Sequence, residues 1–183
     1  QILGNVLDLG VPSDATVSTA KIVDGAVTSA KLASGVGGKV LQVVSVGYAT
    51  TVTQTASSYA TSGLTATITP ASSSNKVLVL TSSSIATFGD GSNSSGRHGL
   101  VGLFRGTVSD TKLLEHDSGV SMHSATTSSK DHSYNTVSFS YLDTPSTTSA
   151  QVYTVGISGQ GACDIRAQSS SQGSTITLLE IAG

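Results

Sequence analysis

Short stretches in which apolar and polar residues alternate follow one another along most of the chain, with Ser, Gly, Asn and Asp between them. In residues 64–70, LTATITP, the alternation places Leu64, Ala66 and Ile68 on one face. A period of two is typical of half-buried strands, and no intervening segment has the helical spacing that would join parallel strands. Strands are expected at residues 40–48, 64–70, 76–88, 98–106, 111–116, 136–143, 150–158, 163–168 and 174–183.

These strands predict an all-β fold, an antiparallel β-sandwich or jelly roll, over residues 39–183. The composition agrees, because charged residues make up 11% and hydrophobic residues 37% of the 183 residues. With so little charge, Ser, Thr, Gly, Asn and Gln must cover the surface, and the β-branched residues Thr and Val favour strands. A disordered chain would be richer in charge and poorer in apolar residues.

The charges also limit the partners. Nine basic and eleven acidic residues give a net charge of −2, and Lys and Arg form no cluster, which argues against nucleic-acid binding. No run of about 18 apolar residues is present, so no membrane insertion is expected. The single cysteine, Cys163, cannot form an intrachain disulfide, so packing or association must hold the fold together.

Ahead of the strands, a ten-residue unit occurs twice in tandem, TVSTAKIVDG at 16–25 and AVTSAKLASG at 26–35. Ser and Thr suit the start of a helical turn, and Gly25 and Gly35 suit its left-handed end. Because one such unit is too short to be stable alone, we expect residues 1–38 to form a collar in which copies of the chain pack around an axis. A flexible linker is the alternative. The residues expected on the axis are Val17, Ile22, Val27 and Leu32.

The last expected strand, 174–183, has apolar residues on both faces. Such a strand needs cover on both sides. One side is the chain's own core, and we expect the other to be a subunit interface, to which Ile176 and Leu178 are assigned.

Four stretches, taken in order, resemble segments of the C-terminal fibre domains of tailed bacteriophages, especially those of marine and cyanobacterial phages. AVTSAKLASG resembles their DGxVTxAKLA repeats, LTATITPASSSNKVLVL their GLxATITPxSxSSKVLV hairpin, LDTPSTTSAQVYTVGI their LDxPxTTSxxxYxV hairpin, and STITLLEIAG their STITLxEI closing strand. Together these cover most of residues 16–183. The resemblance implies a homotrimeric β-sandwich head, similar in plan to C1q/TNF-type knobs, at the end of a thin fibre.

The resemblance also implies a role. The chain is expected to be a tail-fibre tip and adhesin, located in the virion after assembly in the host cytoplasm. Its partners would be two further copies of itself, a host-surface glycan or protein, and other tail or baseplate proteins reached through a missing N-terminal part. The chain starts without Met, so we expect it to begin inside a longer protein. A purely structural fibre or head-decoration protein without its own receptor site is the alternative.

Signals of catalysis are absent from the sequence. No GxSxG occurs, the GGK at 37–39 lacks the rest of a phosphate-binding loop, and GDGSNSSG at 89–96 lacks the alternating acids of a calcium loop. The four histidines have neither HxH nor HExxH spacing. We therefore expect no enzyme activity, no cofactor and no metal site. The histidines, read as solvated loop residues, are His98, His116, His123 and His132.

Receptor binding is assigned to loops. The segments 89–97 and 122–134 exceed the length that paired strands need, and they carry side chains able to hold hydroxylated ligands. Phe88 adjoins the first segment, and Arg166 lies beside a third turn at 169–173. Simple connecting loops are the alternative. The candidate receptor-binding residues are Asp90, Asn93, Arg97, His123, Asp131, His132 and Tyr134.

Overall fold

A computed structural model describes residues 20, 22–28, 31, 39–89, 98–118, 131–161 and 163–183. The chain divides into two units, Gln1–Lys39 and Val40–Gly183. This division falls beside the boundary expected from the sequence.

The described residues of the first unit form turns. The backbone N–H of Ala26 donates to the carbonyl of Val23 at 2.9 Å, which closes a turn over Asp24 and Gly25. Gly25 has φ +78°, a left-handed conformation that glycine adopts without steric cost. The left-handed conformation expected for Gly25 is therefore present.

The expected axial residues are only partly covered by the structure. Ile22 and Val27 are 44% and 53% exposed in the single chain. Val17 and Leu32 lie outside the described residues. Axial packing of the collar therefore stays a prediction.

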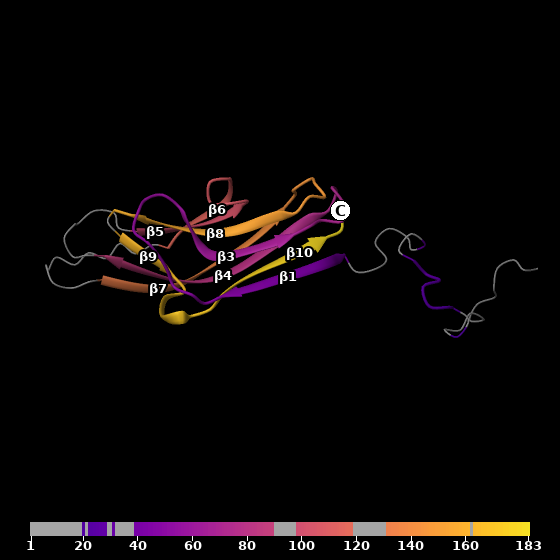
Figure 1. The fold of residues 1–183 in the computed structure, drawn as a ribbon, viewed down its shortest axis with the longest axis horizontal. Helices are drawn as coiled ribbons and strands as arrows, with labels where there is room; N and C mark the ends of the chain where they lie inside the picture. Colours follow the sequence, from indigo (N-terminus) through magenta and orange to yellow (C-terminus); the bar gives the residue numbers. More distant parts are fainter. Residues whose placement is uncertain are drawn as a thin grey trace, which may run out of the picture. The chain divides into compact units, whose positions relative to one another are not determined.

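The second unit is an all-β sandwich of two antiparallel sheets (Figure 1). Sheet A contains β1 (Val40–Tyr48), β2 (Val52–Gln54), β4 (Lys76–Gly89), β7 (Asp131–Asp143), β9 (Cys163–Ala167) and β10 (Ser174–Ile181). Sheet B contains β3 (Ala60–Ile68), β5 (His98–Arg105), β6 (Thr111–Asp117) and β8 (Gln151–Gln160). A short 3-10 helix, η3 (Ser169–Ser171), connects β9 to β10.

The strand order is that of a jelly roll. Strand β7 pairs along one edge of β4, whereas the other edge of β4 pairs first with β10 and then with β9. Without the short strands β2 and β9, the orders are β1-β10-β4-β7 and β3-β8-β5-β6. If these eight strands are renumbered along the chain, the orders become 1-8-3-6 and 2-7-4-5, the arrangement of two Greek keys in a jelly roll.

The two ends of the sandwich differ in what they carry. At the near end, β1 begins and β10 finishes next to the C-terminus. At the far end, β4 finishes at Gly89, which pairs with Asp131 at the start of β7 and with Cys163 at the start of β9. Figure 1 shows these ends on opposite sides of the sandwich.

The core lies between the sheets and follows the period of two. The expected inward face of residues 64–70 is confirmed, because Leu64, Ala66 and Ile68 are all buried. Each large apolar side chain buried in this way stabilises the fold by about 1.5–3 kcal/mol relative to exposure. Other core residues are Val77, Val79, Ile85, Val101, Leu103, Val137, Phe139, Tyr153, Val155, Ile157 and Ile165.

Two residues assigned to a subunit interface belong to this core instead. Ile176 and Leu178 are 0% exposed and pack in the same apolar cluster. Side chains alternate along β10, so Thr177 and Leu179 point outward in their place. The interface assignment of Ile176 and Leu178 is therefore wrong, although the strand does have an outward apolar residue.

Several strand bounds also differ from expectation. Strand β7 begins at Asp131 and not at 136, because it pairs with β4 as far as Gly89. Asp131, His132 and Tyr134 therefore lie in a strand and not in a loop. Strand β3 begins at Ala60 and passes through Gly63, whose φ of +83° accompanies a register shift in its pairing with β8.

Candidate functional site

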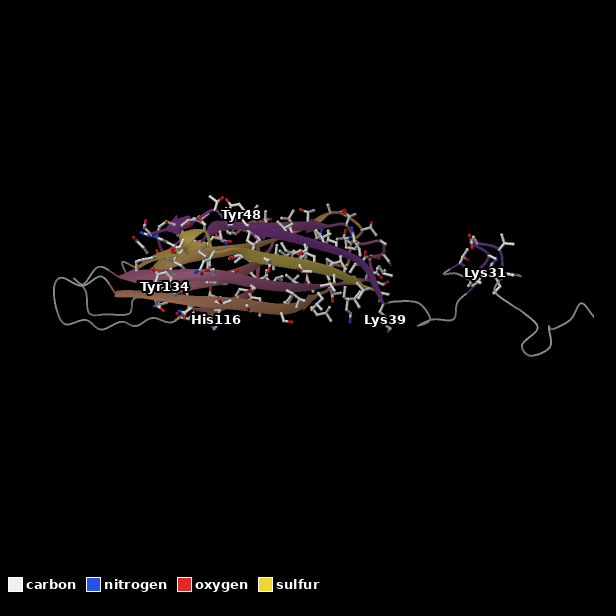
Figure 2. The ribbon with its side chains drawn as sticks, turned by 90° about the horizontal axis from the view of Figure 1, so that it is seen from below. Lys31, Lys39, Tyr48, His116 and Tyr134 are labelled. Atoms are coloured by element: carbon white, nitrogen blue, oxygen red, sulfur yellow. The ribbon has the colours of Figure 1, made fainter. Side chains whose placement is uncertain are left out.

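The outward face of sheet A is organised in rows, because paired residues on neighbouring strands point to the same side. Figure 2 looks onto this face, with β1, β10, β4 and β7 side by side. From the near end toward the far end, the rows are Val43–Leu179–Leu78–Leu142, Ser45–Thr177–Leu80–Ser140, Gly47–Thr175–Ser82–Ser138 and Ser84–Thr136. None of these rows contains an ionisable side chain.

An exposed apolar patch occupies the near end of this face. Val43, for example, is 57% exposed. Among the described residues of the sandwich, the exposed large apolar side chains outside this patch are Tyr134, at the far end of the same sheet, and Val152, which is 37% exposed, on sheet B. The apolar patch consists of Val40, Leu41, Val43, Leu80 and Leu142.

Hydroxyl groups fill the middle of the face. The Oγ of Ser45 and the Oγ1 of Thr177 are 2.9 Å apart across β1 and β10. Cross-strand hydroxyl pairs of this kind support the sheet and leave a polar but uncharged surface. Sheet B differs, because its outward face carries the charged pair Lys112 and Glu115.

At the far end, three strands bring an arginine and two aromatic rings together. Ala86 on β4 pairs with Tyr134 on β7 and with Arg166 on β9, and Phe88 follows on the same side of β4. The Arg166 Cζ lies 4.1 Å from the centroid of the Phe88 ring. The Phe88 and Tyr134 rings meet edge to face, with centroids 6.2 Å apart. Phe88, Tyr134 and Arg166 form the arginine–aromatic cluster.

Arg166 is the unusual member of this cluster. Its side chain is partly buried, and the buried Nε has no hydrogen-bond partner. The described residues supply no acceptor for the other guanidinium N–H groups, and the guanidinium lies over the ring of Phe88. The stack contributes about 0.5–2 kcal/mol. A buried donor without a partner costs about 1–3 kcal/mol, which a bound acceptor would relieve if the side chain shifted toward it.

Tyr134 is the solvent-facing member. It is 61% exposed, and Figure 2 shows it at the far end of the sandwich. Ala86, which lies between Tyr134 and Arg166 in the row, is fully buried, as expected where long side chains on both neighbouring strands cover a small one. The cluster therefore presents the exposed ring of Tyr134 beside the guanidinium of Arg166, which packs on Phe88.

A second group, on sheet B, consists of Tyr59, Lys112 and Glu115 and has a structural role. The Tyr59 hydroxyl donates to Glu115 Oε2 at 2.7 Å, and Lys112 Nζ donates to the same oxygen. Burial, together with this hydrogen bond, raises the pKa of Tyr59. The hydrogen bonds from Lys112 and then Tyr59 lower the pKa of Glu115. Because these side chains bind one another, the group fixes the β2–β3 connection onto sheet B.

The structure places the sequence-predicted receptor residues as follows. Tyr134 lies in the arginine–aromatic cluster. For Asp131 and His132, only the backbone position in β7 is described. The remaining candidates, Asp90, Asn93, Arg97 and His123, lie outside the described residues, so their binding role stays a prediction.

Sequence reasoning noted Phe88 and Arg166 beside separate turns but did not join them to Tyr134. Their meeting depends on β4 lying between β7 and β9, which no local pattern indicates. The described residues contain no group of three His, Cys, Asp or Glu side chains able to hold a metal ion. Nor does that part of the chain contain a helix long and apolar enough to cross a membrane.

Comparison with known proteins gives little beyond weak structural likeness. No family model matches the chain, and no curated protein matches it. The VP2 subviral particle of infectious bursal disease virus is 11% identical over 78% of this chain and 38% of its own, with a TM-score of 0.32. T=1 particles derived from the same virus are 11% identical over 78% of this chain and 36% of theirs, with a TM-score of 0.33. The chain thus spans less than two thirds of these proteins, and TM-scores this low establish neither a family nor a function.

Proposed function

We propose that the chain is the homotrimeric head of a bacteriophage tail fibre, a non-enzymatic adhesin that attaches the virion to a glycan or protein on the host surface. The observation that carries the proposal is the outward face of sheet A. Its apolar patch and uncharged hydroxyl rows leave apolar area in water that another copy of the chain can cover. Contact through the patch and the hydroxyl rows buries no ionised group there, so no desolvation penalty for charge opposes it. Lys76, which pairs with Ile181 in the outermost row of the same face, would lie at the edge of the contact, where its ammonium can stay in water.

The position of the patch supports assembly into a fibre. Val40 and Leu41 belong to the patch and are separated from the end of the tandem repeats by only the four residues 36–39. Contacts between copies in the collar and in the head would therefore be continuous along the chain. When one surface patch meets a different patch of the next copy, the copies form a closed ring if the rotation between them closes, as a threefold rotation does. Three copies match the fibre domains that the sequence resembles.

The far end supports attachment. The arginine–aromatic cluster stands at the end of the sandwich remote from the start of β1, where a host surface could meet it. Three copies of a weak site bind a multivalent surface far more tightly than one copy does. Other tail or baseplate proteins would hold the N-terminal side, and the assembled fibre would form in the host cytoplasm and reside in the virion.

A structural fibre or head-decoration protein is the second candidate. The uncharged face of sheet A favours it equally, because that face accounts for assembly and needs no receptor. The two functions differ only in whether the head binds the host cell.

Competition for adsorption tests the proposal. The purified chain, in its assembled form, is added to host cells before the phage that carries it, and free virions are then counted. The proposal predicts that the assembled head reduces adsorption strongly. The double variant Val43→Lys, Leu142→Lys is the matched control, because loss of assembly should remove avidity and most of the competition. An assembled head that leaves adsorption unchanged at saturating concentration would support the structural candidate instead.

A further inference from the structure

We propose that the arginine–aromatic cluster binds the carboxylate of an acidic carbohydrate. This inference rests on the proposed function, because it names the chemical class of the host ligand. Its basis is the juxtaposition of Phe88, Tyr134 and Arg166, brought together from β4, β7 and β9.

The guanidinium of Arg166 is held and unsatisfied. The Arg166 Cζ lies 4.1 Å from the centroid of the Phe88 ring, a contact that restricts the side chain, and no acceptor within the described part of the chain engages its N–H groups. A planar guanidinium of this kind presents parallel donors that match the two oxygens of a carboxylate. Because the ring contact already restricts the Arg166 side chain, less freedom is lost on binding than for a fully mobile arginine, and only a small shift is needed to bring its N–H groups to the ligand.

The surrounding charge favours a carboxylate over a phosphate. Asp164 lies two residues before Arg166 on the same side of β9, in register with Phe88. Arg166 is the only cation among the described side chains of this cluster, and Asp164 offsets part of its field. A phosphate carries nearly two negative charges, so one arginine beside an aspartate would not neutralise it. A carboxylate carries one negative charge, which a single arginine can balance.

The neighbouring side chains suit a sugar ring. Tyr134 offers an exposed aromatic surface against which the C–H groups of a pyranose can pack. Thr53, paired with Arg166, and the row Ser84–Thr136 supply hydroxyl groups on either side of the cluster. The Thr53 and Thr136 hydroxyls can donate to and accept from the ligand's own hydroxyl groups, whereas Ser84, which donates to Gln172 Oε1 at 3.0 Å, can only accept.

The cluster and the apolar patch are separate surfaces. Leu80 and Phe88 are eight residues apart on β4, a distance of roughly 26 Å along an extended strand. The hydroxyl rows lie between them. Assembly through the patch therefore leaves room for a ligand at the cluster.

The test measures binding of short galacturonate, glucuronate and mannuronate oligomers to the assembled chain by saturation-transfer NMR and titration calorimetry. The methyl ester of each oligomer keeps the sugar skeleton but removes the charge. We expect binding of at least one uronate and at least tenfold weaker binding of its ester. Arg166→Gln should abolish the binding, and Arg166→Lys should weaken it at least tenfold because an ammonium lacks the planar fork. Tyr134→Ala should weaken it several-fold, whereas Tyr134→Phe should retain it.

Lys76→Gln is the matched control, since Lys76 is an exposed cation at the opposite end of the same strand. It should bind as the unaltered chain does. Absence of uronate binding, equal binding of acid and ester, or unchanged binding by Arg166→Gln would each overturn the inference. Light scattering and the adsorption assay on the same samples separate the two proposals: an assembled head that blocks adsorption but ignores uronates refutes only the ligand class.

Discussion

Asp143 shows how single residues hold the near end of the sandwich together. Asp143 is only 5% exposed, and its carboxylate accepts hydrogen bonds from the Tyr153 hydroxyl at 2.7 Å and from Arg105 Nη1 at 3.2 Å. Burial, followed by the contact with Asp143, raises the pKa of Tyr153. A carboxylate this buried is tolerated because both donors meet it.

Removing the Tyr153 hydroxyl should therefore weaken the fold. We expect Tyr153→Phe to lower the free energy of unfolding by about 1–3 kcal/mol, because Asp143 loses one of its donors. Tyr141→Phe is the matched control, since the Tyr141 hydroxyl has no hydrogen bond among the described residues. Chemical denaturation measures both variants, and equal effects would contradict this role for Asp143.

The lowered pKa of Glu115 makes the stability of the fold depend on pH. Its pKa lies below the ordinary value of 4.5 because Lys112 and then Tyr59 donate to the carboxylate. A carboxyl whose pKa is lowered by folding adds stability above pH 4.5 and loses it as pH falls through the folded-state pKa. The stability difference between the unaltered chain and Glu115→Gln should therefore be greater at neutral pH than in acid. Since the pair is exposed, the change should be about 0.2–1 kcal/mol, read from urea melts. A constant difference would contradict the assignment.

At the scale of elements, two glycines let a pair of aromatic rings pack closely against sheet B. Gly102 on β5 pairs with Gly156 on β8. A Cβ at Gly102 would approach Phe104 Cε2 to 2.6 Å, and one at Gly156 would approach the same atom to 2.9 Å. The rings of Phe104 and Tyr59, with centroids 5.0 Å apart, occupy the space that these missing side chains leave.

Filling that space should displace the rings. We expect Gly102→Ala to lower the free energy of unfolding by about 1–3 kcal/mol, because the ring of Phe104 must move. Gly173→Ala is the control, since a Cβ there has open space around it. Thermal and denaturant unfolding report both changes. If Gly102→Ala left the free energy of unfolding unchanged, the rings would not be packed closely against Gly102.

The elements also show what local sequence can predict. The alternation in residues 40–48 indicated the strand that is observed, Val40–Tyr48, because burial of one face depends only on neighbouring residues. Strand β2 was missed because three residues are too few for a period to appear. The inward side of β10 was assigned wrongly, because both its faces are apolar and only the pairing partners decide which one is buried.

The candidate site was predicted least well for a related reason. Phe88, Tyr134 and Arg166 stand far apart in sequence and meet only because β7 and β9 pair with opposite edges of β4. That register depends on long-range contacts across the whole jelly roll. The hydrophobic pattern shows that strands exist but not which strands become neighbours.

In the assembled molecule, we propose that the outward face of sheet A joins copies of the chain. The apolar patch is exposed in the single chain, and the hydroxyl rows beside it carry no charge. The outward face of sheet B, with Lys112 and Glu115, offers no comparable surface. Association through the apolar patch would therefore remove its exposed valine and leucine side chains from water, with Lys76 left at the edge of the contact.

Light scattering coupled to size-exclusion chromatography measures this association. We expect three times the mass of the 18.3 kDa chain at micromolar concentration. The double variant Val43→Lys, Leu142→Lys should give the monomer mass, because lysines would be buried in the interface. Val152→Lys, an equivalent change on sheet B, should remain a trimer. A monomeric unaltered chain, or a trimer that persists in the double variant, would contradict the account.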